Sequence, residues 1–322
     1  MLMSCGAGIN ASAKTAFDRL WNSYEEFGVG RIAHPSGAKI LDCGILSPGG
    51  LAAGMAFAEV CLAAKAQVEL SNGDDAVWPG PWIQVQSDAP TQACMLGQYA
   101  GWPVQHEDFF AMGSGPMRVR RGKEELLTSL DAQDNDKLAV GTLECEKIPE
   151  QAALEYMAAE CEVELENLHL AIAPTSSVAG CVQVVARSIE TALHKLHEMK
   201  FPLGAVQSAH GTAPLCPPIP DFAKGIGRTN DAILYGATVS LWIDADDEQV
   251  RMAGEKLPSC NSADFGRPFF EIFKQYAYDF YKIDPGLFSP ARVLIMNLRS
   301  GKSWSFGGLR RDLIAQSFGC ES

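Results

Sequence analysis

The chain has 322 residues, of which 47% are hydrophobic and 20% are charged, a composition that is typical of folded globular proteins and excludes an intrinsically disordered one. Its net charge of −13 argues against a nucleic-acid-binding protein, because affinity for phosphate backbones depends on clustered Lys and Arg, and it favours a small-molecule partner. The length is large for a single hydrophobic core and therefore predicts two domains.

The first part of the chain predicts helices that alternate with strands. Apolar residues at helical spacing predict a helix with its N-cap at Asn10 that ends before Gly28 and Gly30. Hydrophobic or alternating runs predict strands at 38–45, 82–87 and 109–112. Helical spacing predicts helices at 49–66, 90–99 and 116–130. The polar stretch 131–137 predicts a surface crossing near the middle of the chain.

The second part predicts strands at 138–145, 168–174 and 239–244, a helix at 150–162 and a hairpin at 292–308. Residues 215–236 predict a loop-rich segment, because prolines at its start preclude regular structure. This mixture of hairpins and strand–helix units favours the α+β class, with two mixed α/β domains. We place an N-terminal α/β domain at 1–135 and a C-terminal α/β domain at 136–322, between which segments can exchange.

The predicted helix at 184–197 carries an unusual polar stripe beside its apolar face. The stripe consists of Gln183, Arg187, Glu190, His194 and His197. Arg187 and Glu190 are spaced to face each other, and periodicity alone predicts a solvent-exposed flank with an ion pair worth about 0.2–0.5 kcal/mol. His194 and His197, with His210, do not match the usual helical metal-ligand spacing, so we discount a metal site.

Two glycine-flanked motifs are candidate binding sites. The turn at 113–116 leads from a strand into a helix start, where backbone N–H groups can bind an anion, although a tight strand-to-helix turn explains it equally well. Residues 228–231 supply consecutive donors and acceptors between glycines, although Thr229 or Asn230 could instead cap a helix. Residues 300–303 imitate a P-loop, but Met296 stands where that motif requires glycine.

The cysteines and the N-terminal residues indicate the cellular compartment in which the protein is found. Ten cysteines are spread along the chain without a C-x-x-C pair, so we expect reduced, buried thiols. Residues 1–17 lack a basic segment followed by an apolar one, so we expect no export signal. The apolar run at 49–66 is interrupted by Glu59 and is too short to cross a bilayer. These features predict a cytoplasmic protein without a membrane partner.

Motifs along nearly the whole chain together resemble methenyltetrahydromethanopterin cyclohydrolases. They are YAGW at 99–102, FFAMGSGP at 109–116, VARSIE at 185–190, GIGRTNDAILYG at 225–236 and SGKSWSFGG at 300–308. The main departures lie at the N-terminus and in the acidic stretch 131–137. The resemblance implies a cytoplasmic homotrimer of two-domain α+β subunits that bind the pterin in an interdomain cleft and use no metal or nucleotide cofactor.

The resemblance also implies an activity and its residues. Enzymes of this family reversibly hydrolyse 5,10-methenyltetrahydromethanopterin, or its dephospho relative, to the 5-formyl compound in the one-carbon metabolism of methanogenesis or formaldehyde oxidation. The family's essential glutamate falls on Glu190 and its partner arginine on Arg187. The substrate carbon lies between two nitrogens that share a positive charge, so it needs a deprotonated water and a returned proton rather than a metal.

The remaining candidate site residues bind rather than react. We expect the pterin edges and the anionic tail to contact Arg228, Thr229, Asn230, Asp231, Tyr235, Gly113, Ser114, Gly115 and Arg118. Two alternatives stay open: a cyclohydrolase acting on a folate or a purine-precursor formamide, and a pterin-binding protein without catalysis. The retention of both Arg187 and Glu190 argues against the second alternative.

Overall fold

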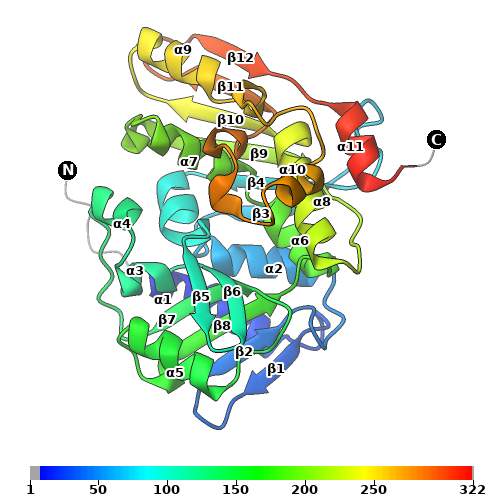
Figure 1. The fold of residues 1–322 in the computed structure, drawn as a ribbon. Coiled ribbons are helices and arrows are strands. Elements are labelled where there is room, and N and C mark those ends of the chain that lie inside the picture. Colours follow the sequence, from blue (N-terminus) through cyan, green and yellow to red (C-terminus); the bar gives the residue numbers. More distant parts are fainter. Residues whose placement is uncertain (1–7, 321–322) are drawn as a thin grey trace. The chain divides into compact units, whose positions relative to one another are not determined.

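The computed structural model describes residues 8–320, with Tyr281 described by its backbone alone, and contains two compact units (Figure 1). Within the described residues, unit 1 comprises 8–66 and 92–180, and unit 2 comprises 67–91 and 181–320. Each unit is built around one six-stranded mixed sheet with helices, which confirms the predicted α+β class. No helix among residues 8–320 is long and apolar enough to cross a membrane.

The sheet of unit 1 is covered by helices on both faces. Its order is β1 (Gly30–Ala33), β2 (Lys39–Asp42), β8 (Leu168–Ala173), β7 (Ala139–Glu144), β6 (Phe109–Ser114) and β5 (Trp102–His106), with β2, β8 and β7 parallel. Helices α1 (Ile9–Asn22) and α2 (Leu51–Cys61) pack on one face, and α5 (Gln151–Glu160) packs on the other. Helices on both faces explain why nearly every residue of β7 and β8 is buried, rather than alternate residues.

The sheet of unit 2 is mainly antiparallel and packs one face against helices. Its order is β12 (Ser303–Gly307), β11 (Arg292–Asn297), β10 (Thr238–Ile243), β9 (Val206–Pro214), β4 (Trp82–Ser87) and β3 (Gln67–Ser71). Alternate residues Val239, Leu241 and Ile243 of β10 are fully buried. The α-helices that lie wholly within this unit include α7 (Ser188–Glu198), α8 (Phe222–Gly236), α9 (Asp247–Lys256), α10 (Phe269–Gln275) and α11 (Arg311–Phe318). The terminal hairpin β11–β12 confirms the prediction for 292–308.

The predicted start of the first helix is wrong in detail, whereas residues 131–137 lie mostly at the surface, as predicted. The N-cap of α1 is Gly8, whereas Asn10 lies inside the helix and is fully buried. Asp134, in the polar stretch, accepts hydrogen bonds from the Asn10 backbone N–H at 2.8 Å and from its side-chain Nδ2 at 2.9 Å. The acidic stretch therefore neutralises the positive end of α1, which lies far from it in sequence.

Three predicted helices have a different form. Residues 91–98 form a π-helix, and 116–130 contain two short helices, α3 (Met117–Arg121) and α4 (Glu125–Ser129), separated by Gly122 at φ +63°. The helix predicted at 184–197 consists of α6 (Val178–Val185) and α7, with a break between them. No disulfide joins the described cysteines, most of which are buried as predicted. Cys260 and Cys320 are exposed, and Cys5 lies outside the described residues.

Candidate active site at the junction of α6 and α7

The break between α6 and α7 places Arg187 and Glu190 at the start of a helix. Arg187 donates its backbone N–H to Val184 O at 3.0 Å, a tightened turn that ends α6, and its own carbonyl accepts the first α7 bond from Thr191 N at 3.0 Å. Arg187 is therefore the N-cap residue of α7, with φ −88° and ψ 10°, and Glu190 lies in the first turn. At the first turn of a helix, the partial positive charge of the backbone N–H groups favours a carboxylate such as that of Glu190.

The polar side chains of this junction are buried, so the solvent-exposed flank that periodicity alone predicted is wrong. Gln183 and Ser188 are 1% exposed, Arg187 is 8% exposed and Glu190 is 7% exposed. The Arg187 Nη2 donates to Gln183 Oε1 at 3.1 Å. Buried polar groups interact more strongly than the same groups in water, because the local dielectric is lower. The junction therefore holds an acid and a guanidinium within one turn in an environment suited to proton transfer.

Residues 225–236 form helix α8 rather than the predicted loop. The helix begins after Asp221, whose carboxylate accepts from Lys224 N at 2.9 Å as an N-cap. Its glycines serve packing, since a Cβ on Gly227 would overlap the Cβ of Phe270 at 2.8 Å. Neither Thr229 nor Asn230 caps the helix, because both lie well inside it. Gly227 thus reflects a close contact between α8 and α10 rather than a loop.

The predicted binding residues at 228–230 have partners within unit 2. Arg228, which is half-buried, donates from Nε to Ser317 O at 3.0 Å and from Nη1 to Pro217 O at 3.1 Å. Thr229 is fully buried, and its hydroxyl donates to Gly225 O at 3.0 Å. Asn230, which is half-buried, donates from Nδ2 to Ile226 O at 2.9 Å. Arg228 and Asn230 are therefore polar residues whose side chains are partly accessible to solvent.

Asp231 and Tyr235 hold neighbouring segments against α8. Asp231 is 1% exposed, accepts from Phe269 N at 2.7 Å and Ser317 Oγ at 2.6 Å, and burial raises its pKa to about 7. The Tyr235 hydroxyl donates to Arg267 O at 2.5 Å and accepts from Gly266 N at 3.2 Å, and burial raises its pKa to about 12. These two side chains therefore fix α10 and α11 in unit 2.

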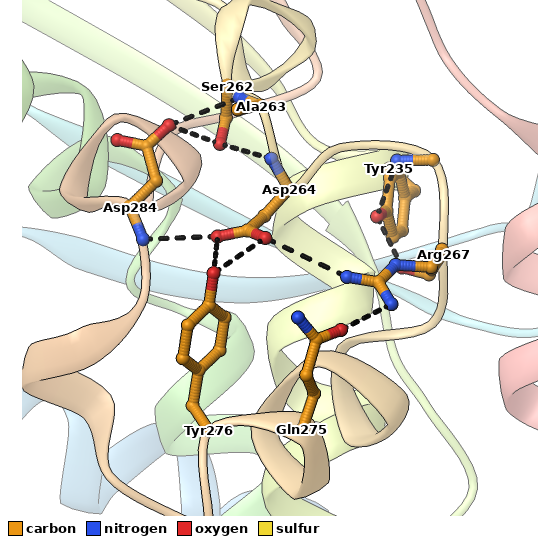
Figure 2. A network of polar contacts seen from close by, with 9 residues as sticks. Tyr235, Ser262, Ala263, Asp264, Arg267, Gln275, Tyr276 and Asp284 are labelled. Carbon is orange, nitrogen blue, oxygen red and sulfur yellow. Dashed lines mark hydrogen bonds and ion pairs between the residues drawn. The ribbon is translucent and has the colours of Figure 1, made fainter.

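The segment that Tyr235 holds is organised around the carboxylate of Asp264, as Figure 2 shows. Asp264 accepts from Tyr276 Oη at 3.1 Å and from Asp284 N at 3.2 Å, and its Oδ1 lies 3.7 Å from Arg267 Nη2. Asp284 in turn accepts from Ser262 Oγ at 2.6 Å. This network uses its acidic groups to shape an irregular part of the chain.

The turn at Gly113–Pro116 is closed by internal contacts in unit 1. Gly115 has φ +88° and donates its N–H to Gly97 O at 2.8 Å, so that this N–H already has an acceptor. Arg118 is fully buried, pairs with Glu124 at 2.8 Å between Nε and Oε1, and donates to Met95 O at 3.2 Å. A substrate anion that bound Arg118 would have to compete with these contacts.

The structure brings only some of the predicted site residues together. Arg187 and Glu190 lie within one turn of α7, and Arg228–Tyr235 lie on α8; both helices contact β9. Gly113–Arg118 belong to unit 1. The sequence analysis placed Gln183 on the polar stripe without a role, although its position four residues before Arg187 was a usable signal.

The comparisons with known proteins agree on one family. The family model described as "Cyclohydrolase (MCH)" matches residues 8–318. A protein of Rhodopirellula baltica named methenyltetrahydromethanopterin cyclohydrolase is 48% identical, over 97% of this chain and 95% of its own length. The chain belongs to the methenyltetrahydromethanopterin cyclohydrolase family.

Further relatives extend this similarity to more distant organisms. Proteins named methenyltetrahydromethanopterin cyclohydrolase from Methylobacillus flagellatus and Methanospirillum hungatei are 47% and 40% identical, and they cover 88% and 97% of this chain. The matches cover 87% and 98% of those two relatives. The resemblance found in the sequence is therefore confirmed, and the chain is an enzyme of the cyclohydrolase family.

Proposed function

We propose that this enzyme reversibly hydrolyses 5,10-methenyltetrahydromethanopterin, or its dephospho form, to the 5-formyl compound. The observation that carries the proposal is the similarity, over 97% of the chain, to a relative named for this substrate. The same likeness leads us to propose a cytoplasmic homotrimer that binds its pterin in a cleft between two domains and acts in one-carbon metabolism.

In the proposed mechanism Glu190 moves a proton between water and the substrate. The carboxylate takes one proton from a water molecule while the oxygen bonds to the methenyl carbon and gives a neutral carbinolamine. The bond from this carbon to the departing nitrogen then breaks, and Glu190 returns its proton to that nitrogen. The carbinolamine hydroxyl loses its own proton to solvent as the formyl C=O forms. Each turnover thus consumes one water and releases one proton.

Arg187 orients this carboxylate in the proposal. Its guanidinium is 8% exposed and lies at the N-cap of the helix that carries Glu190. A planar guanidinium can hold a carboxylate oxygen in one direction through a charge-assisted hydrogen bond and favours the ionised, basic form. The negative charge of Glu190 also attracts the cationic ring of the substrate.

Some of the proposed binding residues contact the substrate, whereas others hold in place the structure around it. Arg228 and Asn230 are half-buried and are our proposed contacts for the pterin edges. The side chains of Thr229, Asp231 and Tyr235 are buried and support binding indirectly, by stabilising the structure of α8. The turn at Gly113–Gly115 is our proposed site for the anionic tail, and Arg118 fixes this turn, since its guanidinium is bound to Glu124.

The test of the mechanism is the variant Glu190→Gln, followed by the loss of absorbance of the methenyl chromophore. We expect kcat to fall about 100-fold or more, because a positioned acid–base group contributes about 10²–10⁴-fold and the amide cannot accept the proton. Glu198→Gln is the matched control at the other end of α7, where the carboxylate is 57% exposed. Turnover of Glu190→Gln within a few-fold of wild type, at equal thermal stability, removes Glu190 from the mechanism.

The same assay separates the alternatives. Methenyltetrahydromethanopterin and methenyltetrahydrofolate are compared side by side, since the chemistry at the reacting carbon is nearly identical. Faster turnover of the folate would replace the proposed substrate. Hydrolysis no faster than the spontaneous rate on either compound would leave a pterin-binding protein without catalysis.

A further inference from the structure

Gln183 is a buried polar residue beside the proposed catalytic pair that the mechanism above does not use. It lies on α6, is 1% exposed, and accepts from Arg187 Nη2 through Oε1 at 3.1 Å. Because a guanidinium has donors but no acceptor, the amide must present its oxygen to Arg187 and keep its Nε2 on the other side. Within residues 8–320, that Nε2 is buried and has no hydrogen-bond partner.

The unpaired amide N–H group is costly, and an apolar side chain of the same size would avoid this cost. Leaving a buried donor unsatisfied loses the free energy of its hydration, whereas replacing it by an isosteric apolar group removes that loss. Stability therefore does not explain why a glutamine occupies this position. Its one described polar contact is with Arg187, which points to a role in the proposed reaction.

We propose that Gln183 is a positioning residue that fixes the orientation of the Arg187 guanidinium, an inference that rests on the proposed hydrolysis. Arg187 lies at the break between two helices, and an arginine side chain has many staggered rotamers. The contact from Gln183, four residues earlier on α6, selects one of them. The orientation of Arg187 in turn sets the direction in which Glu190 is held.

The test compares two substitutions of nearly equal size with different chemistry. Gln183→Met fills the same volume but removes the acceptor for Arg187. Gln183→Glu keeps an oxygen towards Arg187 and accepts its hydrogen bond most strongly when ionised. Gln151→Met is the control, since Gln151 is an exposed glutamine on α5 in unit 1, where its Nε2 donates to Glu155. We would measure kcat, KM, Tm and the pH profile of each.

We expect Gln183→Met to lower kcat about tenfold to 100-fold with KM changed less than about threefold, because a misplaced catalytic group slows the chemical step. Its Tm should equal or exceed that of wild type. Gln183→Glu should recover activity relative to Gln183→Met as pH rises and the introduced carboxyl ionises, a signature that a merely structural role would not produce. Gln151→Met should match wild type.

Two results would overturn the inference while leaving the proposed function intact. In the first, wild type hydrolyses the substrate, Glu190→Gln does not, and Gln183→Met retains kcat within about twofold. In the second, Gln183→Glu and Gln183→Met are equally impaired at every pH. A wild-type enzyme that does not accelerate hydrolysis would instead overturn the proposed function, and the role of Gln183 would fall with it.

Discussion

At the scale of single residues, Asp231 combines deep burial with a raised pKa. Its carboxyl is 1% exposed, and burial raises its pKa from 3.8 to about 7, against the lowering effect of hydrogen bonds from Ser317 and Phe269. Between these two pKa values the native state binds more protons than the unfolded state does. The free energy of unfolding therefore falls as pH rises from about 4 to 7 and loses nothing more to this group above pH 7.

The variant Asp231→Asn should remove this pH dependence. An asparagine can still accept from Phe269 N through Oδ1 and can donate from Nδ2 to the hydroxyl oxygen of Ser317. We expect the variant to equal wild type near pH 4 and to exceed it by up to ~4 kcal/mol at pH 8, from about three pKa units at 1.36 kcal/mol each. Chemical denaturation across this pH range measures the difference.

Asp244→Asn is the control for this experiment, because Asp244 is an exposed carboxylate of the same unit that pairs with Arg299. It should leave the pH dependence of unfolding as in wild type. Identical pH profiles for wild type and Asp231→Asn would show that the carboxyl of Asp231 titrates alike in the folded and unfolded chains.

At the scale of elements, the position of the α6–α7 junction depends on a glycine in β9. A Cβ on Gly211 would overlap the Ser188 Oγ and would lie 3.0 Å from Ile189 Cγ1. Ser188 and Ile189 are the first residues of α7, directly before Glu190. The absence of a side chain at Gly211 is therefore what allows the start of this helix to lie so close to the sheet.

Gly211→Ala should accordingly displace the start of α7. We expect a destabilisation of about 1–3 kcal/mol, because an extra methyl group in a close-packed site forces its neighbours to shift. A fall in kcat should accompany it, since the shifted turn carries Glu190. Thermal unfolding and the hydrolysis assay measure the two effects. Gly204→Ala is the matched control, since nothing lies within 4 Å of its Cβ, and wild-type behaviour of Gly211→Ala would refute the packing argument.

Sequence patterns predicted the element types well wherever local periodicity decides the structure, as in β4 and β7, which run close to the predicted strands. They failed where a contact distant in sequence decides it. The prolines before α8 correctly indicated an irregular segment, but the loop prediction continued into the helix, where Gly227 serves the approach of Phe270. A continuous helical pattern hid the break before Ser188. Periodicity did not predict the burial of Arg187 and Glu190 for the same reason, whereas the resemblance to the family singled out both residues as candidates.

At the scale of the whole molecule, the two units are formed from alternating segments of the chain. The hairpin of β3 and β4, within 67–91, belongs to unit 2, and β4 pairs with β9. Alternation predicted β4 as a strand but could not predict this partner, because pairing across about 120 residues leaves no local trace in either strand. The chain thus begins unit 1, forms the hairpin of unit 2 at 67–91, and then returns at residue 92 to complete unit 1.

This topology predicts that residues 1–180 alone will not form a well-behaved domain. In that fragment β4 lacks its partner β9, and the apolar side chains of Val68, Ile83 and Val85, which are buried in the full chain, become exposed on an isolated hairpin. A two-stranded hairpin is marginal in water, and its open edge and apolar face favour aggregation. We expect the fragment to aggregate on expression.

The matched control is the same fragment with residues 67–91 replaced by a short Gly/Ser linker. The segments that flank the excised residues approach each other, since the Cys61 thiol contacts Gln98 O at 4.0 Å and a Cβ on Gly97 would lie 2.7 Å from Cys61 O. Removal of the hairpin leaves the sheet of unit 1 and both of its hydrophobic clusters complete. We therefore expect this variant to be soluble and to unfold cooperatively in circular dichroism. Equal solubility and equal Tm for the two fragments would show that the hairpin does not depend on β9 for its stability.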